Sequence, residues 1–159
     1  MVNPEELDHE YFMSEAIKEA KIAGERGDLP VGAVIVHEGK IISRGNNSTK
    51  TNQNRTLHAE MSAINNHAAF WQQHARECVI YTSLEPCIMC LSTIVMTNIR
   101  HIVYAVEDKY MNMKPFIKSN DYIDQRVHSY TGGILAEESF EVIQTYHEEM
   151  AGLVSTGKR

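Results

Sequence analysis

Two cysteines spaced three positions apart, directly behind a proline, constrain this chain more than any other feature. They lie in residues 83–90, SLEPCIMC, between a short apolar run typical of a strand and a longer run with helical spacing. At positions i and i+3 of a helix, the thiolates of Cys87 and Cys90 can face one point. The first turn of a helix also lowers a thiol pKa, as metal binding requires. Two thiolates do not complete a metal site, so the fold must bring further ligands to them.

The sequence His-Ala-Glu at residues 58–60 opens another helical pattern and offers the missing groups. With His58, the two cysteines make three protein ligands, which leave the fourth tetrahedral position of a zinc ion open to water, as in catalytic zinc sites. Zinc lowers the pKa of such a water toward neutrality. Glu60 would take a proton from it and deliver the proton to a leaving group. The two fragments together predict a zinc-dependent hydrolase.

Each fragment alone has a plainer interpretation. A CxxC pair alone is typical of thiol redox chemistry or of structural zinc, and a Glu in a first helical turn commonly interacts with the helix dipole. A redox pair needs no upstream His-x-Glu, however, and a closed zinc site needs a fourth protein ligand that the sequence does not offer. The combination therefore favours catalytic zinc. Cys78 has no partner at ligand spacing, and we predict that it is a core cysteine.

Length and composition indicate a single domain over residues 1–159. The chain is 43% hydrophobic and 23% charged, as expected of a globular protein with one core. It has no apolar run near 18 residues and no leader-like start, so we expect no membrane partner and a cytoplasmic location. The net charge of −6 opposes general attraction to polyanions. Basic residues in the middle of the chain form either a solvated face or a rim around a site for an anion.

The pattern of apolar residues predicts the order helix, hairpin, helix, strand, helix, strand, strand, helix. Asn3 would cap the first helix, and the tail from about residue 152 would be flexible. This order predicts a three-layer α/β/α fold with a five-stranded mixed sheet, in which the first hairpin is antiparallel and the later strands are largely parallel. Residues 111–124 are predicted to be irregular, with a short helix at most. The expected strands are 31–36, 41–45, 79–82, 102–106 and 127–130, and the expected later helices are 58–69, 87–96 and a terminal one after residue 133.

Residues 58–60 and 86–90 match the two-part signature H-x-E and P-C-x-x-C of the zinc-dependent cytidine/nucleobase deaminase superfamily. The chain resembles that superfamily from its first helix to its last. It is most similar to the branch of tRNA adenosine deaminases, guanine deaminases and fungal-type cytosine deaminases. The resemblance implies a cytidine-deaminase-like fold and one zinc ion per chain, held by His58, Cys87 and Cys90. It also implies that Glu60 carries protons from the zinc-bound water to the ring nitrogen and the leaving ammonia.

The resemblance further implies which residues contact the substrate. Asn47 matches an asparagine that holds the base edge, although a turn residue is its plainer interpretation. The backbone of Ala59 and the turn that begins at Glu85 would line the base pocket, and Asp108 matches an acid near the substrate of the tRNA enzymes. Members of the family commonly form dimers or tetramers through helices beside the site. We therefore expect a homodimer, although the apolar helix 91–96 suits a buried core equally well.

The chain departs from the tRNA enzymes in segments that would meet the substrate. Residues 108–116, DKYMNMKPF, stand where those enzymes have a Lys-x-Gly-Ala-x-Gly-Ser-like loop, and Thr56-Leu57 is similar to fungal cytosine deaminase. The terminal helix, basic in the tRNA enzymes, carries Glu148 and Glu149, which oppose contacts with phosphates.

These departures favour a small-molecule partner. We expect hydrolytic release of ammonia from a free base, nucleoside or related amino-heterocycle of the cytosine, guanine or adenine type, in nucleobase salvage. The alternative is a tRNA-specific adenosine deaminase that forms wobble inosine. Four apolar residues of the changed loop either form a lid over a small ring or pack on the core: Tyr110, Met111, Met113 and Phe116.

Overall fold

Five strands form one mixed sheet in the computed structural model, which describes residues 1–159. In spatial order they are β2 (Lys40–Asn46), β1 (Gly32–His37), β3 (Cys78–Leu84), β4 (His101–Val106) and β5 (Ser129–Thr131). Strand β1 runs antiparallel to both of its neighbours, while β3, β4 and β5 are mutually parallel. The predicted antiparallel hairpin and parallel later strands are therefore confirmed. The antiparallel pairing of β1 with β3 joins these two parts of the sheet.

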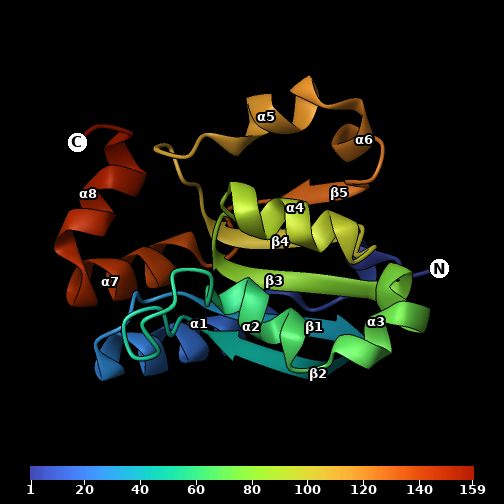
Figure 1. Cartoon of the computed structure of the whole chain (residues 1–159), viewed down its shortest axis with the longest axis horizontal. Helices are drawn as coiled ribbons and strands as arrows, with labels where there is room; N and C mark the ends of the chain where they lie inside the picture. The colour runs from blue at the N-terminus through green and yellow to red at the C-terminus, as the bar shows by residue number, and fades with distance from the viewer.

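Helices cover both faces of the sheet and give the predicted three layers (Figure 1). Helices α1 (His9–Arg26) and α7 (Ala136–Tyr146) pack on one face, and α2 (Ala59–Asn65) and α4 (Ile88–Met96) lie on the other. None of the helices is both long and apolar enough to span a membrane. The remaining helices are short: η1 (Pro4–Glu6), α3 (Ala68–His74), η2 (Ala75–Glu77), α5 (Met113–Ser119), α6 (Asp121–Asp124) and α8 (Glu148–Thr156).

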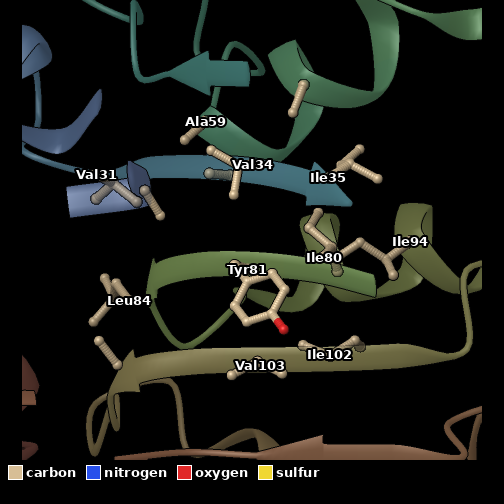
Figure 2. Close-up of a cluster of buried hydrophobic side chains, with 14 of the residues drawn as sticks. Val31, Val34, Ile35, Ala59, Ile80, Tyr81, Leu84, Ile94, Ile102 and Val103 are labelled. Carbon is tan, nitrogen blue, oxygen red and sulfur yellow. The ribbon is translucent and has the colours of Figure 1, made fainter. Parts of the chain in front are cut away.

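The core lies on both faces of the central strands, because β3 and β4 are buried along their whole length. Ile80 lies beside Ile94 of α4 in the hydrophobic cluster (Figure 2). Tyr81 points to the opposite face, where its hydroxyl hydrogen-bonds His9 Nδ1 at 2.8 Å and its ring packs on Phe12. Strands that are apolar on both faces require helices on both faces. Alternate side chains of β3 therefore pack against different helical layers of the molecule.

Gly45 sets the distance between α2 and the sheet. A Cβ atom built there would lie 2.5 Å from Ala63 N and closer still to Ala59 O. The backbone of α2 thus rests directly on β2. On the same helix, Ala63 O accepts a 2.5 Å hydrogen bond from Ser43 Oγ of β2. The start of α2, which follows His58, is held by these contacts at a fixed place on the sheet.

Two predicted helices are divided in the structure. The predicted helix 58–69 is interrupted after Asn65, where Asn66 Nδ2 donates to Arg44 O at 2.9 Å and the backbone of His67 leaves helical geometry. The predicted terminal helix is interrupted at His147, whose extended backbone separates α7 from α8 and whose Nδ1 accepts from Met150 N at 3.2 Å. A side-chain hydrogen bond lies at each interruption, one to the distant strand β2 and one within the next turn. The apolar periodicity did not reveal either bond.

The chain ends also differ from the prediction. Asn3 caps only η1, and Asp8 caps α1 by accepting from Tyr11 N at 3.0 Å. The tail predicted to be flexible from about residue 152 is helical to Thr156. Burial of Val154, whose carbonyl accepts from Lys109 N at 3.0 Å, fixes this segment on the loop after β4. The stretch 111–124, predicted to be irregular with a short helix at most, contains two short helices, α5 and α6. Strand β5 begins two residues later than predicted.

Candidate metal centre and active site

Three candidate metal ligands meet at the starts of two neighbouring helices. His58 is the residue before α2, Cys87 is the residue before α4, and Cys90 lies in the first turn of α4. Strand β3 leads into α4 through residues 85–87, so the end of a central strand fixes where Cys87 lies. Helices α2 and α4 contact each other on one face of the sheet. The predicted convergence of the two sequence fragments is therefore present.

The geometry of these three side chains fits a zinc ion. His58 Nδ1 lies 3.5 Å from Cys87 Sγ and 3.5 Å from Cys90 Sγ, and all three ligand atoms lie within 4.8 Å of one another. With zinc–nitrogen and zinc–sulfur bonds of about 2.0 and 2.3 Å, tetrahedral geometry places nitrogen and sulfur about 3.5 Å apart. One imidazole and two thiolates also form a donor set that zinc prefers. No fourth protein ligand joins this group.

Electrostatics within the group favour a bound cation. A hydrogen bond with the Cys90 thiol lowers the pKa of Cys87 to about 4, and contact with His58 contributes to the decrease. Cys87 in turn raises the pKa of Cys90, as does burial. Cys87 also raises the pKa of His58. A zinc ion would replace these protons and balance the two thiolates.

Glu60 lies in the first turn of α2 and is buried. Burial raises the pKa of this carboxyl group. Its Oε1 accepts a 2.9 Å hydrogen bond from Thr82 Oγ1 of β3, which also lies 3.0 Å from Leu84 O. This role of Thr82 was not predicted from the sequence, although a hydroxyl group in an otherwise apolar strand is a signal for a buried hydrogen bond. The strand thus fixes the orientation of the carboxylate beside the metal ligands.

A cavity of about 160 Å³ adjoins the metal ligands. It brings together every site residue predicted from the sequence except Cys90, which is buried behind it. Of the loop residues considered as a lid, only Met111 lines the cavity. Met113 is buried in the core, Phe116 packs against it, and Tyr110 is exposed. The lining residues are Leu29, Val31, Asn47, His58, Ala59, Glu60, Leu84, Glu85, Cys87, Asp108, Met111 and Met150.

Asn47 forms the turn considered for it and also lines the cavity. Its Oδ1 accepts from Thr49 N at 3.1 Å and from Thr49 Oγ1 at 2.9 Å, which is the side-chain turn expected after a strand. The residue is 2% exposed and lines the cavity. Its Nδ2 group makes no hydrogen bond within the protein and remains available to a ligand as a donor.

Asp28 anchors the loop that leads from Asn47 to the metal ligand. This buried carboxylate accepts from Lys50 N, Thr51 N, Thr51 Oγ1 and Arg26 Nε at 2.6–2.9 Å. Burial alone would raise the pKa of Asp28, but the hydrogen bonds from Thr51 and Arg26 outweigh it and lower the pKa to about 2. Arg26 also donates to Asn47 O at 2.6 Å. The sequence placed Asp28 in a turn and gave no sign of this role.

Glu85 and Asp108 also contribute to the cavity wall. Glu85 accepts from Asp108 N at 3.0 Å and from Tyr130 OH at 2.8 Å. Asp108 Oδ1 accepts from Tyr110 N at 2.9 Å and from Met111 N at 3.0 Å. These bonds tie the ends of β3, β4 and β5 together and place Met111 at the cavity. Both carboxylates therefore already have structural partners.

Comparisons with known proteins agree with this site. The family model of the cytidine and deoxycytidylate deaminase zinc-binding region matches residues 6–106. The tRNA-specific adenosine deaminase of Streptococcus pyogenes serotype M1 is 32% identical over 145 residues, which cover 87% of this chain and 83% of that relative.

Two solved structures extend the comparison. One, from studies of A-to-I editing by tRNA:A34 deaminases at the wobble position of transfer RNA, has a TM-score of 0.69 and 32% identity, over 83% of this chain and 98% of that one. The guanine deaminase of Bacillus subtilis has a TM-score of 0.57 and 36% identity, over 62% of this chain and 64% of that one.

The family match spans both sequence fragments and every residue of the cavity lining except Asp108, Met111 and Met150. It offers no support for a thiol-redox module. The relatives are deaminases, which hydrolyse carbon–nitrogen bonds. The chain therefore belongs to the cytidine and deoxycytidylate deaminase family and is a zinc-dependent deaminase.

Proposed function

We propose that this enzyme deaminates adenosine at the wobble position of tRNA and forms inosine. The observation that carries the proposal is the extent of the similarity to tRNA deaminases. It covers 87% of this chain in one relative and 98% of the solved tRNA:A34 deaminase structure. The similarity thus continues beyond the zinc-binding region that all branches of the family share. For this reason we favour a tRNA substrate over a free base, although the loop 108–116 and the acidic terminal helix favour the free base.

Basic residues beside the cavity support a nucleic-acid partner. The hydrogen bond from Lys109 N to Val154 O brings the end of α8 to the loop after β4, and the Arg159 guanidinium lies 5.5 Å from the Tyr110 ring. In the loop anchored by Asp28, which follows the cavity residue Asn47, Lys50 is exposed. Cations in both of these loops suit contacts with phosphates that flank the target base. They partly offset the acidic start of α8.

The residues of the cavity have separable roles in this proposal. When bound, zinc would lower the pKa of a water molecule in its fourth position and so supply the nucleophile. Glu60, held by Thr82, would move one proton of that water to the ring nitrogen and then the second proton to the departing ammonia. Asn47 Nδ2 and the backbone of Ala59 would hold the edge of the base. Glu85 and Asp108 would shape the cavity wall through the loop bonds that they make.

The cavity volume of about 160 Å³ suits one base and no helix, so the adenosine must leave its stack to enter. The overall reaction consumes one water and releases one ammonia, and the oxygen of inosine comes from the water. The enzyme needs no further co-reactant.

The direct test offers the zinc-loaded enzyme an anticodon stem-loop with adenosine at the wobble position. We expect inosine in that RNA and no ammonia from adenine, guanine, cytosine or their nucleosides. The same stem-loop with the adenosine moved one position is the matched substrate control, and the Glu60→Gln variant is the enzyme control. Turnover of free bases with none of the RNA would overturn the tRNA proposal and leave the deaminase assignment intact.

A free purine base is the second candidate. Two observations favour it: the acidic residues Glu148 and Glu149 at the start of α8, and the 36% identity to a guanine deaminase. The same assay separates the candidates, because ammonia release from guanine would identify the second.

A homodimer through α4 is also part of this proposal. Two apolar side chains on this helix, Ile88 and Met96, are 48% and 68% exposed in the single chain. Exposed apolar groups of this size on one helix are typical of an interface. The partner would then cover the helix that holds Cys90.

A further inference from the structure

A second cavity lies at the end of the sheet opposite the zinc ligands. Its volume is about 360 Å³. Three arginines line it from separate elements: Arg76 in η2, Arg100 just before β4, and Arg126 just after α6. His101 and His128 line it as well, and no carboxylate does. We call this group of five residues the arginine cavity. A strongly cationic hollow is unexpected in a chain with a net charge of −6.

The three arginines have no acidic partners. None of the ion pairs in the structure includes Arg76, Arg100 or Arg126. Arg126 donates to Tyr122 O at 3.1 Å and stacks 3.5 Å over the Tyr122 ring, and Arg100 Nη2 donates to Asn98 Oδ1 at 3.0 Å. Neutral groups therefore orient two of the guanidinium groups, and nothing in the protein balances their charge.

Arg100 carries the strongest sign of a missing ligand. It is 7% exposed, and its Nη1 is the one buried side-chain nitrogen or oxygen atom in the structure without a hydrogen-bond partner. Burial, together with the positive charges of Arg76 and Arg126, lowers the pKa of Arg100. A buried donor without an acceptor and a group of like charges both destabilise a fold. An anion in the cavity would relieve both.

The donors of the cavity match one class of anion. Guanidinium groups bind phosphate oxygens through paired N–H donors, and three of them line the cavity from separate elements. The imidazole rings of His101 and His128, 5.8 Å apart, add further donors. We propose that the arginine cavity binds a phosphate group, either free as phosphate or pyrophosphate or within an RNA backbone. The site is separate from the zinc site and does not depend on which base the enzyme deaminates.

The test uses the zinc-loaded full chain and follows its melting temperature. Phosphate or pyrophosphate is compared with chloride at equal ionic strength, so that general screening cancels. Near-saturating anion should raise the melting temperature by about 3–5 °C. The double variant Arg76→Gln/Arg126→Gln should lose this increase. In chloride alone it should melt no lower than the unsubstituted chain, because one source of repulsion is gone.

Lys21→Gln/Lys40→Gln is the matched control, because it removes two exposed charges that form no ion pair and lie outside the cavity. It should keep the full phosphate response. Binding of a labelled tRNA to each variant then distinguishes the two sources of phosphate. A loss of tRNA affinity of more than about fivefold, in the arginine variant alone, identifies RNA. Loss of the phosphate response with unchanged tRNA binding identifies a free anion.

Two results would overturn the proposal. One is an unsubstituted chain whose melting temperature responds equally to phosphate and chloride and whose tRNA affinity matches that of the arginine variant. The other is an equal effect of the arginine and lysine double variants. Neither result bears on deamination, since the zinc site keeps all its residues in both variants.

Discussion

The substitution Gly45→Ala tests how the sheet positions the metal centre. The new Cβ would lie 2.5 Å from Ala63 N, where ordinary contacts begin at 3.4 Å. The two nearest atoms, Ala59 O and Ala63 N, both belong to the backbone of α2, so no side chain can rotate away to relieve the collision. The helix must move by about 1 Å, and it carries Glu60 and follows His58 directly.

The expected magnitudes follow from this displacement. Overpacking of this kind costs about 1–3 kcal/mol, or a fall of about 3–10 °C in melting temperature for a chain of this size. A displacement of about 1 Å at a reacting group lowers the rate about 10²-fold. In the unsubstituted chain, His58 Nδ1 lies 3.5 Å from the sulfur atoms of Cys87 and Cys90. A shift of α2 would change these distances, so the zinc affinity should fall together with the rate.

Zinc content by elemental analysis, melting temperature and turnover measure these three effects in one preparation. Gly152→Ala is the matched control, since Gly152 is exposed in α8 and a Cβ there meets nothing within 4 Å. That change should stabilise the chain by about 0.5–1 kcal/mol and leave turnover unchanged. A Gly45→Ala variant with normal zinc content, stability and turnover would refute the claim that this contact positions α2.

Four further changes test separate parts of the account. Glu60→Gln should keep one zinc per chain and lower kcat by about 10²–10⁴, as measured by product formation. Thr82→Val removes the hydrogen bond to that carboxylate and should lower kcat about tenfold with little change in KM. Asp28→Asn should cost about 2–3 kcal/mol at neutral pH, as measured by denaturant unfolding. Met96→Glu should convert a dimer to a monomer in light scattering, because it would bury an unpaired charge at the interface.

For each of these four variants, one result would contradict the role assigned to the substituted residue. Substantial turnover by Glu60→Gln would remove its proton-transfer role, and an unchanged kcat in Thr82→Val would make that hydroxyl a packing group only. The pKa of Asp28 is lowered to about 2 from 3.8, so its stabilisation is complete above about pH 4 and lost as the pH falls toward 2. A stability difference between Asp28→Asn and the unsubstituted chain that persists at pH 2 would contradict this origin. An unsubstituted monomer would exclude the α4 dimer.

The metal centre was predictable because its ligands occupy short, separated fragments with fixed spacing. The i and i+3 positions of Cys87 and Cys90 determine their geometry once a helix forms, and the layer order brings His58 to them. The strands were predictable for a similar reason, since β1, β3 and β4 are apolar on both faces. The local run of apolar residues is enough to predict these strands.

The groups that hold the site in place were not predictable in this way. Thr82 reaches Glu60 across 22 positions, and Asp28 binds a loop more than 20 positions away. Such contacts depend on how layers pack, and no spacing rule encodes them. Of the two alternatives for the loop after β4, core packing holds for Met113 and Phe116, while Met111 lines the cavity. Met113 is buried because it begins the helix α5, whose bounds the sequence pattern did not predict.

The central claim is that His58, Cys87 and Cys90 hold the zinc ion that the reaction requires. Zinc stoichiometry of the unsubstituted enzyme and of Cys87→Ser, measured with turnover on the same samples, tests it most directly. We expect one zinc per chain in the unsubstituted enzyme, and loss of both zinc and turnover in Cys87→Ser. A Cys87→Ser enzyme that keeps its zinc and its activity would contradict the claim.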